Sequence, residues 1–471
     1  MPWQVEQRGL EPVPPDERHL RPRSILWTWL AANIGVLGVS LGSGLVSGLG
    51  LNLWQAVIVT VVGTMGAFAF VALVSIAGPL SGAPTLVASR ATFGVRGNRA
   101  PAVVSWLVLT GLEVMMATTS TFAIANIAEI LGFPSGPLLD LPVALVLIAG
   151  VTAAAYVGHS LIMWMQKWLG WVLGGLTAAL CAVAVTTVDW PVVMAAPAAD
   201  FAAVLGGIGV VAAGTGVSWM SAGADYTRYL DRTQSKKSLF GVTIIGAVVP
   251  VAVLVLTGTS LALGNDQATG IALPDWLLIP YLIVAVLGML TSATLALYSS
   301  GLSLQAVGVP GSRPRVAAAN GALVAVVTMV VVGARATSGD DAVLAGLTAV
   351  IGVLAVPLVA WVGVFGLDLL LRRDVFTPDL TVSGPESDYW FRRGFHVPAV
   401  ASWIVGSVAG LLCVTVAVGP TVWFSGPLAD TWLGRNSLGW LVAGIAASAV
   451  YWVLEPLTRS PGAPGRAHPS S

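Results

Sequence analysis

Long apolar runs separated by short polar segments dominate this sequence. A helix that crosses a bilayer needs about 20 apolar residues, and about twelve runs reach that length. The predicted spans cover residues 25–48, 53–77, 102–132, 139–157, 160–188, 203–224, 238–264, 276–306, 315–334, 343–371, 395–418 and 437–455. The pattern therefore predicts an all-α integral membrane protein with about 12 transmembrane helices.

Basic residues gather in the loops on one side of these spans. They precede the first predicted span and follow the second, sixth, eighth, tenth and last spans, whereas the alternate loops hold only Arg335 and Arg435 beside several aspartates. Short cytoplasmic loops collect lysine and arginine. Both termini are therefore expected in the cytoplasm, and the protein is expected in the plasma membrane.

The segments outside the predicted spans are short. Residues 1–24 are expected to be a cytoplasmic N-terminal segment, and residues 372–394 a cytoplasmic loop. Residues 456–471 are rich in proline, glycine and serine, which predicts a disordered cytoplasmic tail. No stretch between the spans is long enough for a soluble domain, so the function is expected to lie within the bilayer.

Composition narrows the class of function. Of 471 residues, 56% are hydrophobic and 9% are charged, with a mean hydropathy of +0.86, whereas a soluble domain carries about 25% charged residues. The 22 basic and 22 acidic residues balance. The sequence contains no basic stretch interleaved with aromatic residues, so it does not indicate a nucleic-acid partner. The sequence also contains no nucleotide-binding loop, no nucleophile arrangement and no metal-ligand spacing. It therefore does not indicate an enzyme or a cofactor.

Two of the predicted spans are unusually rich in glycine. The first contains ANIGVLGVSLGSGLVSGLG and the sixth contains GGIGVVAAGTGVSWMSAGADYTRYL. Glycine costs about 1 kcal/mol in a helix interior relative to alanine. One explanation is close helix packing through small residues. The other is a break in each helix, at corresponding positions of two inverted five-helix repeats, residues 25–188 and 189–371, followed by two additional helices within residues 395–455.

Broken helices would give the polar residues of the sixth span a role in binding. Such breaks create a substrate site near the membrane midplane. Trp219 is expected to stack on a ring, while Ser218, Ser221 and the backbone near Gly216 are expected to supply hydrogen-bond partners. The alternative for Trp219 is a place in the aromatic belt at the membrane interface.

Asp225 and Arg228 follow at the cytoplasmic end of the same span. Residues three positions apart lie on one face of a helix. The two side chains are therefore expected to pair and to form an inner gate rather than a ligand site.

Glu113 is an acid within the third predicted span. A carboxylate in a membrane segment costs about 2.5 kcal/mol or more, so it normally faces a cavity or a partner. Three roles remain open for Glu113. It binds an N–H group of the substrate, it carries a coupling proton, or it is a buried acid bonded to neighbouring threonine or backbone groups.

Five motifs carry a resemblance to a known family. They are RPRSILWTWLAANIG in the first span, GPLSGAPTLVASRATFGVRGN after the second, SWMSAGADYTRYLDR in the sixth, LYSSGLSLQAVGV in the eighth and PLVAWVGVFGLDLLLRR in the tenth. The chain resembles the nucleobase:cation symporter family, the relatives of the purine-cytosine and hydantoin permeases, over nearly its whole length. The resemblance implies the five-plus-five inverted-repeat fold. It also implies uptake of a cytosine-, purine-, hydantoin- or allantoin-like heterocycle coupled to sodium or protons.

The resemblance also implies a cation site. Thr291 and Ser292 match the paired hydroxyls of the eighth helix that ligate sodium. The first-helix carbonyls that complete the site should lie near Ala32 and Gly35. Hydroxyl and carbonyl oxygens suit a hard monovalent cation.

The substrate site departs from the family pattern. Leu112 stands where relatives have a second stacking tryptophan, and Met116 stands near it where a polar group is expected. The asparagine of the eighth helix is also missing, and its candidate positions hold Ala293, Leu295 and Leu297. The resemblance thus implies a ring held by one aromatic side chain instead of two.

The sequence therefore predicts a monomeric secondary active symporter for a small nitrogen heterocycle, with lipid, substrate and a coupling cation as its partners. Two alternatives remain open. One is an uncoupled facilitator with the same fold, and the other is a membrane sensor that binds the substrate without transporting it.

Overall fold

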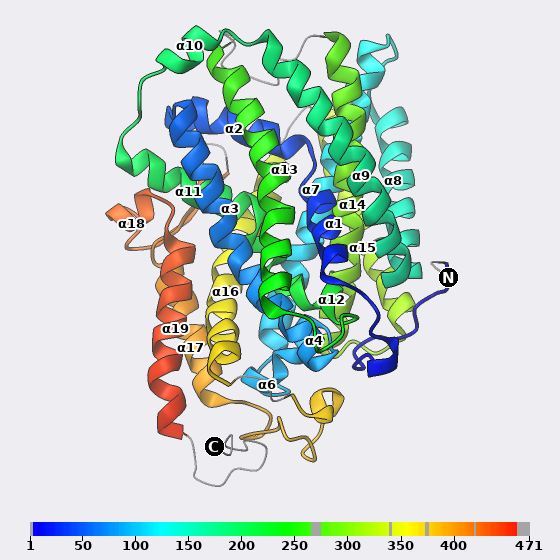
Figure 1. Cartoon of the computed structure of the whole chain (residues 1–471), viewed down its shortest axis with the longest axis vertical. Helices are drawn as coiled ribbons and strands as arrows, with labels where there is room; N and C mark the ends of the chain where they lie inside the picture. The colour runs from blue at the N-terminus through cyan, green and yellow to red at the C-terminus, as the bar shows by residue number, and fades with distance from the viewer. Residues whose placement is uncertain (1–2, 265–274, 339–341, 373–375, 419–420, 459–471) are drawn as a thin grey trace.

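The computed structural model describes residues 3–264, 275–338, 342–372, 376–418 and 421–458 as a bundle of long helices (Figure 1). The first half of the chain forms η1 (Pro15–Glu17), α1 (Pro22–Ala32), α2 (Val36–Leu49), α3 (Leu53–Ser75), α4 (Ala77–Ser81), α5 (Thr85–Ala88), α6 (Arg90–Phe93), α7 (Arg99–Ile130), α8 (Pro137–Val157), α9 (His159–Ala184), η2 (Val185–Thr187) and α10 (Trp190–Ala195). The second half forms α11 (Phe201–Thr215), η3 (Val217–Ala222), α12 (Gly223–Thr227), α13 (Lys236–Gly264), α14 (Asp275–Val307), α15 (Arg313–Ser338), α16 (Ala342–Arg372), η4 (Pro378–Thr381), α17 (Val397–Leu411), β1 (Thr415–Val418), β2 (Thr421–Ser425), α18 (Trp432–Arg435) and α19 (Gly439–Thr458).

The predicted all-helical membrane architecture is confirmed. In the part of the chain that the structure describes, ten helices are long and apolar enough to cross a membrane. The pair α1 and α2 adds an eleventh span if it is taken as one helix bent by 59°. Helix α17 has 15 residues and is shorter than the others. Length and composition thus give ten or eleven spans, against about twelve expected from hydropathy.

The predicted span at residues 395–418 is wrong at its second end. Helix α17 ends at Leu411, and Thr415–Val418 pairs antiparallel with Thr421–Ser425 as a short hairpin. β-Branched residues favour strands, and a hydropathy window does not distinguish an apolar strand from the end of an apolar helix. Most of the predicted tail, from residue 459 onward, lies outside the described residues.

Helices α7 and α14 form the centre of the bundle. They pack along each other, and α8, α9, α15 and α16 pack around them. In both central helices 67% of the most apolar segment is buried inside the protein, compared with 22% in α19. Residues on α7 and α14 are therefore the best placed to meet side chains from several spans.

Glycine allows α2 and α13 to lie in close contact. A Cβ atom at Gly42 would overlap the carbonyl oxygen of Val255, and one at Gly258 would overlap that of Val39. Gly44, on the same helix as Gly42, has no atom near its Cβ position. Close packing of small residues therefore explains part of the glycine content of the first span.

The N-terminal segment crosses the lower end of the bundle, which we define by residues 5–20, α4 to α6 and α12 (Figure 1). Its backbone bonds to three distant segments. Glu6 donates to the carbonyl of Val157, residue 13 donates to that of residue 82, and residue 20 donates to that of residue 229. The predicted N-terminal segment is thus packed into the protein.

Candidate functional site

The first span is broken between α1 and α2. Helix α1 ends at Ala32, and Gly35 is fully extended, with φ 176° and ψ 170°. The carbonyl of Gly35 accepts the N–H of Gly38. The last carbonyls of a helix have no partner within the helix, and they form the negative end of its dipole. The break therefore exposes acceptor oxygens inside the bundle.

The sixth span is irregular around Trp219. Helix α11 is followed by the 3-10 turn Val217–Ala222 before the chain continues as α12. A stretch of 3-10 helix within a span often marks a hinge or a functional segment. A Cβ atom at Gly216 would collide with Ala67 and Phe68 of α3, so only glycine fits there. The predicted break in the first span is therefore present, whereas the sixth span continues over Phe201–Thr227 and changes helix type instead of breaking.

A cavity of about 90 Å³ lies between the two irregular segments. This volume is large enough for several water molecules. Its walls come from the α1–α2 break, α7, α11, η3, α13 and α14. The residues selected from the sequence that line it are Ala32, Gly35, Leu112, Met116, Ser218, Trp219 and Ser292.

Trp219 is held in place by other aromatic side chains. It is 3% exposed, and its ring centroid lies 5.7 Å from that of Trp29 in an edge-to-face arrangement. Trp29 contacts Phe68 and Tyr226 in the same way. Edge-to-face pairs of this kind favour a defined ring orientation. Trp219 therefore faces the cavity rather than the lipid interface.

Among the other lining residues, the polar or sulfur-containing ones were not predicted from the sequence: Asn33, Met115, Thr215 and Met289. The Nδ2 atom of Asn33 donates to the carbonyl of Trp29 at 2.8 Å, which leaves its Oδ1 atom as an acceptor. An amide in the middle of an apolar span is unusual. That signal marks Asn33 in the sequence, whereas nothing distinguishes the two methionines from other apolar residues.

Ser221, Gly216 and Glu113 do not line the cavity. The hydroxyl of Ser221 accepts from that of Ser105 on α7 at 2.8 Å. Glu113 is 1% exposed and accepts from Nδ2 of Asn320 on α15 at 3.3 Å. These polar groups thus form contacts between helices, because Ser221 of η3 faces α7 and Glu113 of α7 faces α15. The substrate contacts expected for Ser221 and Glu113 stay predictions, and neither side chain lines the cavity.

Thr291 and Ser292 bring hydroxyl oxygens to the end of α1. Thr291 Oγ1 lies 3.2 Å from the carbonyl oxygen of Ala31, and Ser292 Oγ lies 2.6 Å from that of Ala32. Both hydroxyls also approach the carbonyl of Gly288, at 2.7 and 3.2 Å. Neutral oxygens at the end of a broken helix are the ligands that transporters use for a monovalent cation.

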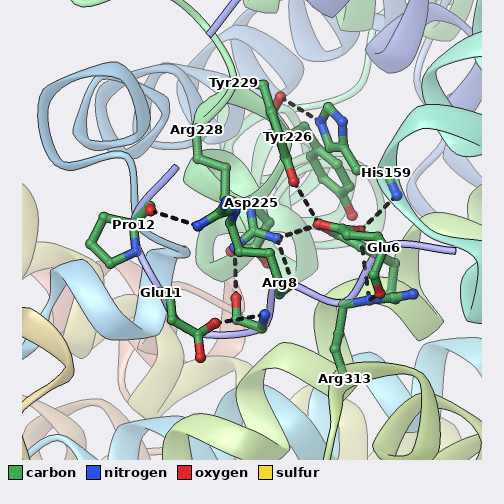
Figure 2. A network of polar contacts seen from close by, with 12 residues as sticks. Glu6, Arg8, Glu11, Pro12, His159, Asp225, Tyr226, Arg228, Tyr229 and Arg313 are labelled. Atoms are coloured by element: carbon green, nitrogen blue, oxygen red, sulfur yellow. Dashed lines mark hydrogen bonds and ion pairs between the residues drawn. The ribbon is translucent and has the colours of Figure 1, made fainter. Parts of the chain in front are cut away.

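Arg228 does not pair with Asp225, so the pairing expected from helical spacing is wrong. Figure 2 shows the guanidinium group turned toward the N-terminal segment, with Nη2 2.7 Å from Glu6 Oε1 and Nη1 2.7 Å from the carbonyl of Gly9. Asp225 accepts the backbone N–H of Thr85 at 2.8 Å instead. Spacing within a helix predicts which residues share a face, but here a distant segment supplies the partner.

Glu6 connects the N-terminal segment to four other parts of the chain, and Figure 2 shows its carboxylate among their side chains. Its Oε1 atom accepts from the hydroxyls of Tyr229, after α12, and Tyr298 of α14, at 2.8 and 3.1 Å. Its Oε2 atom accepts the N–H of His159 at the start of α9, at 2.9 Å. Arg313 of α15 lies 3.6 Å from the same oxygen. We call Glu6 and these partners, together with Arg228, the Glu6 clamp.

The Glu6 clamp is suited to an ionised carboxylate. Gly158 has φ 108°, and a Cβ atom there would overlap the carboxylate of Glu6. Burial raises the pKa of Glu6, but the positive charges of Arg228 and Arg313 and the interaction with His159 outweigh it. The pKa of Glu6 therefore lies below its usual value of 4.5.

Comparison with known proteins relates this arrangement to a family. Residues 12–443 match the family described as permeases for cytosine/purines, uracil, thiamine, allantoin. The Bacillus subtilis protein YxlA, whose name assigns it to the purine-cytosine permeases, is 30% identical over 171 residues, which is 36% of this chain and 35% of YxlA. The purine-cytosine permease FCY2 of Saccharomyces cerevisiae is 24% identical over 274 residues, 56% of this chain and 49% of FCY2. Both matches span less than half of the relative.

Solved structures share the fold. Mhp1, a nucleobase-cation-symport-1 family transporter in a closed conformation with bromovinylhydantoin bound, has a TM-score of 0.72 at 17% identity over 96% of each chain. A Na⁺-coupled sialic acid symporter in an outward-open state has a TM-score of 0.63 at 12% identity over 94% of this chain and 91% of that one. At these identities the likeness concerns the fold alone.

These findings confirm the inverted-repeat transporter fold expected from the sequence and the family expected from its motifs. The family match covers the two irregular spans, the cavity between them and the helices around it. The chain belongs to the family of permeases for cytosine, purines, uracil, thiamine and allantoin.

Proposed function

We propose that this protein is a secondary active transporter that takes up a small planar nitrogen heterocycle together with a cation. The observation that carries the proposal is the cavity between the α1–α2 break and η3, with Trp219 in its wall. Discontinuous helices place substrate and ion sites at their breaks. Membership of a permease family supports a transporter rather than an enzyme.

The cavity offers a flat aromatic face, apolar walls and few polar atoms. Trp219 provides the face, while Leu112 and Met116 provide apolar and polarisable surface. Asn33 Oδ1 and the hydroxyl of Ser218 are available for the polar edges of a ring. A nucleobase, a hydantoin or allantoin combines a planar ring with N–H and C=O groups, so these compounds are the substrate class we propose.

Sodium is the coupling ion that the site chemistry favours. The proposed site consists of the hydroxyls of Thr291 and Ser292 with the carbonyls at the end of α1. Ser292 and Ala32 also line the cavity. A cation that fixes these two residues changes the shape of the substrate site and thus the affinity for the substrate. By thermodynamic linkage, the substrate must change the affinity for the cation by the same factor.

Alternating access requires a gate at each end of the cavity. We assign the inner gate to the Glu6 clamp, because Arg228 at the end of the sixth span is part of it. The excess of arginine in the loops of the lower end supports a cytoplasmic location for that end and for both termini. We therefore propose a plasma-membrane importer that acts as a monomer.

Uptake into proteoliposomes tests the proposal. The purified full chain is reconstituted and supplied with radiolabelled cytosine, uracil, hypoxanthine, allantoin, thiamine or hydantoin, with an inward sodium gradient. We expect at least one compound to accumulate above its external concentration and to leak out when gramicidin dissipates the gradient. Equal sodium on both sides and protein-free liposomes are the controls.

The same assay separates the alternatives. A compound that equilibrates without accumulating under sodium or proton gradients identifies an uncoupled facilitator. Saturable binding without counterflow identifies a sensor. Absence of both binding and uptake for all six compounds contradicts the proposed substrate class.

A further inference from the structure

Glu113 occupies a polar site that is separate from the cavity. It lies near the middle of α7 and is 1% exposed, while its neighbours Leu112 and Met116 line the cavity on another side of the helix. Asn320 of α15 donates from Nδ2 to Glu113 Oε2 at 3.3 Å and to the hydroxyl of Ser300 on α14 at 2.8 Å. Three spans therefore meet at this carboxyl group.

The orientation of Asn320 is fixed by Trp106. The indole Nε1 atom of Trp106 only donates hydrogen bonds, and it lies 2.8 Å from Asn320 Oδ1. The hydroxyl of Thr110 lies 3.5 Å from the same oxygen. The Nδ2 atom of Asn320 must therefore face Glu113. A metal cation needs oxygen ligands, so an amide N–H₂ group on this side disfavours sodium at Glu113.

No charge balances a Glu113 carboxylate within the described ranges, where none of the ion pairs involves it. Its Oε1 atom has no hydrogen-bond partner there. The helices packed on this part of α7 contribute apolar side chains, such as Ile148 of α8 and Leu347 of α16, besides Ser300 and Asn320. Among the described residues, Tyr226 is a titratable group close enough to interact electrostatically with Glu113, and its phenol is neutral.

A buried ion without a counter-charge is much more costly than a buried neutral acid. The neutral acid keeps the hydrogen bond from Asn320 to Oε2 and places its proton on Oε1, the oxygen that has no partner. A polar residue inside a membrane span that is not needed for packing commonly belongs to a substrate or proton pathway.

We propose that Glu113, oriented by Asn320, is a proton-binding site of the transport cycle, distinct from the oxygen cluster at Thr291 and Ser292. The proposal rests on the proposed transport function. A proton from the outer side forms an O–H bond at Oε1 of Glu113, and the neutral acid allows the closed bundle to form. After the bundle opens to the cytoplasm, the O–H bond breaks and the proton passes to water.

Infrared difference spectroscopy of the purified full chain tests the site without any substrate. A protonated carboxyl group gives a C=O stretching band that a carboxylate lacks. We expect this band in the wild-type spectrum at neutral pH and its loss in Glu113→Gln. The matched control is Glu129→Gln, because Glu129 lies on the same helix but is exposed; this variant should keep the band. An identical spectrum for Glu113→Gln and wild type overturns the proposal.

A second variant covers the case in which Glu113→Gln does not fold. Asn320→Leu removes the donor to Oε2 but leaves the acid in place. We expect the carboxyl band to shift in frequency in Asn320→Leu and to remain present. An unshifted band in this variant shows that Asn320 does not orient the acid and overturns the proposal.

Transport then tests the role of the proton. Each compound of the six-compound panel is supplied to proteoliposomes under an inward proton gradient, with equal sodium concentrations on both sides so that sodium supplies no driving force. We expect Glu113→Gln to lose at least tenfold in gradient-driven accumulation while counterflow exchange remains, since exchange needs no net proton movement. Proton-driven accumulation that equals wild type contradicts the proposal. If the wild type transports no compound under either a sodium or a proton gradient, the proposed function is wrong, and the infrared spectra still test the site at Glu113 independently. Accumulation by the wild type under a sodium gradient but not under a proton gradient contradicts the proton site.

Discussion

The Oγ atom of Ser292 on α14 lies 2.6 Å from the carbonyl oxygen of Ala32, the last residue of α1. Both residues also line the cavity. One contact therefore joins a broken helix, a central helix and the proposed substrate site. A change in this contact is expected to reach the ion and the substrate together.

Ser292→Ala should weaken sodium activation of uptake. A hydrogen-bonding group that faces a charge contributes about 1.5–3 kcal/mol, so the sodium concentration for half-maximal uptake should rise by roughly 10- to 150-fold. The control is Thr294→Ala, because the hydroxyl of Thr294 bonds only to Leu290 of its own helix. A sodium dependence in Ser292→Ala that equals that of the control contradicts the assigned site.

Trp219→Ala should weaken substrate binding without abolishing the fold. Stacking of a base on an aromatic ring contributes about 1–3 kcal/mol, so the dissociation constant of the transported heterocycle should rise by roughly 5- to 150-fold. Trp219→Phe, which keeps a ring, should lose less. The exposed Trp452 of α19 provides the control, and Trp452→Ala should bind as wild type does. Equal affinities for all variants, measured by calorimetry, would remove Trp219 from the site.

Glu6→Gln should release the N-terminal segment. Breaking a buried ion pair typically costs about 3–5 kcal/mol because the partner charge is left unpaired. Hydrogen exchange of the amides in residues 6–9 should therefore accelerate by a factor on the order of 100 or more. Glu17→Gln breaks only the exposed pair with Arg8 and should leave this exchange unchanged. Similar exchange rates in both variants would show that the Glu6 clamp does not hold the N-terminal segment in place.

The Glu6 clamp also predicts a pH dependence of that protection. The pKa of Glu6 is lowered in the folded protein. The stabilisation that ionised Glu6 provides is therefore fully present above the ordinary pKa of 4.5, and it is lost as pH falls through the lowered pKa. Protection of residues 6–9 should thus stay constant from neutral pH down to about that value and fall at lower pH. Glu6→Gln should not show the fall. Loss of protection already near neutral pH in the wild type would contradict an ionised Glu6.

Gly42→Ala should destabilise the packing of α2 on α13. The new methyl group would overlap the carbonyl of Val255, so the backbone must move. Overpacking of this kind costs about 1–3 kcal/mol. Gly44→Ala, which meets no atom, should be neutral or stabilising because alanine favours helix. Melting curves of the two variants in detergent compare them directly, and equal melting temperatures would exclude close contact at Gly42.

Much of the fold was predictable because a helix that crosses a bilayer must be apolar over a defined length. Apolar length fixed the helices, and glycine clusters located both irregular spans. The contacts that depend on distant segments were not predictable in the same way. Asp225 and Arg228 share a helical face, yet Glu6 supplies the partner of Arg228 from more than two hundred positions away. The short hairpin after α17 was missed because its residues are as apolar as a helix end.

The candidate site was also predictable only in part. Trp219 and Ser292 stand out because an indole and a hydroxyl are conspicuous at a break, and both line the cavity. Glu113 stands out as well, but the direction in which its side chain points depends on how α7 is rotated about its axis relative to α14 and α15. Sequence periodicity in a helix buried on all sides does not specify that rotation. Asn320, its partner, has no signal apart from its polarity.

The central claim is that substrate and cation bind between the α1–α2 break and the irregular segment η3. Determining the structure of the protein with sodium and the transported heterocycle tests it most directly. The account predicts ring density against the indole of Trp219, between the α1–α2 break and η3, and cation density between Ser292 and the end of α1. A ring bound elsewhere, with no ligand density beside Trp219, would contradict the account.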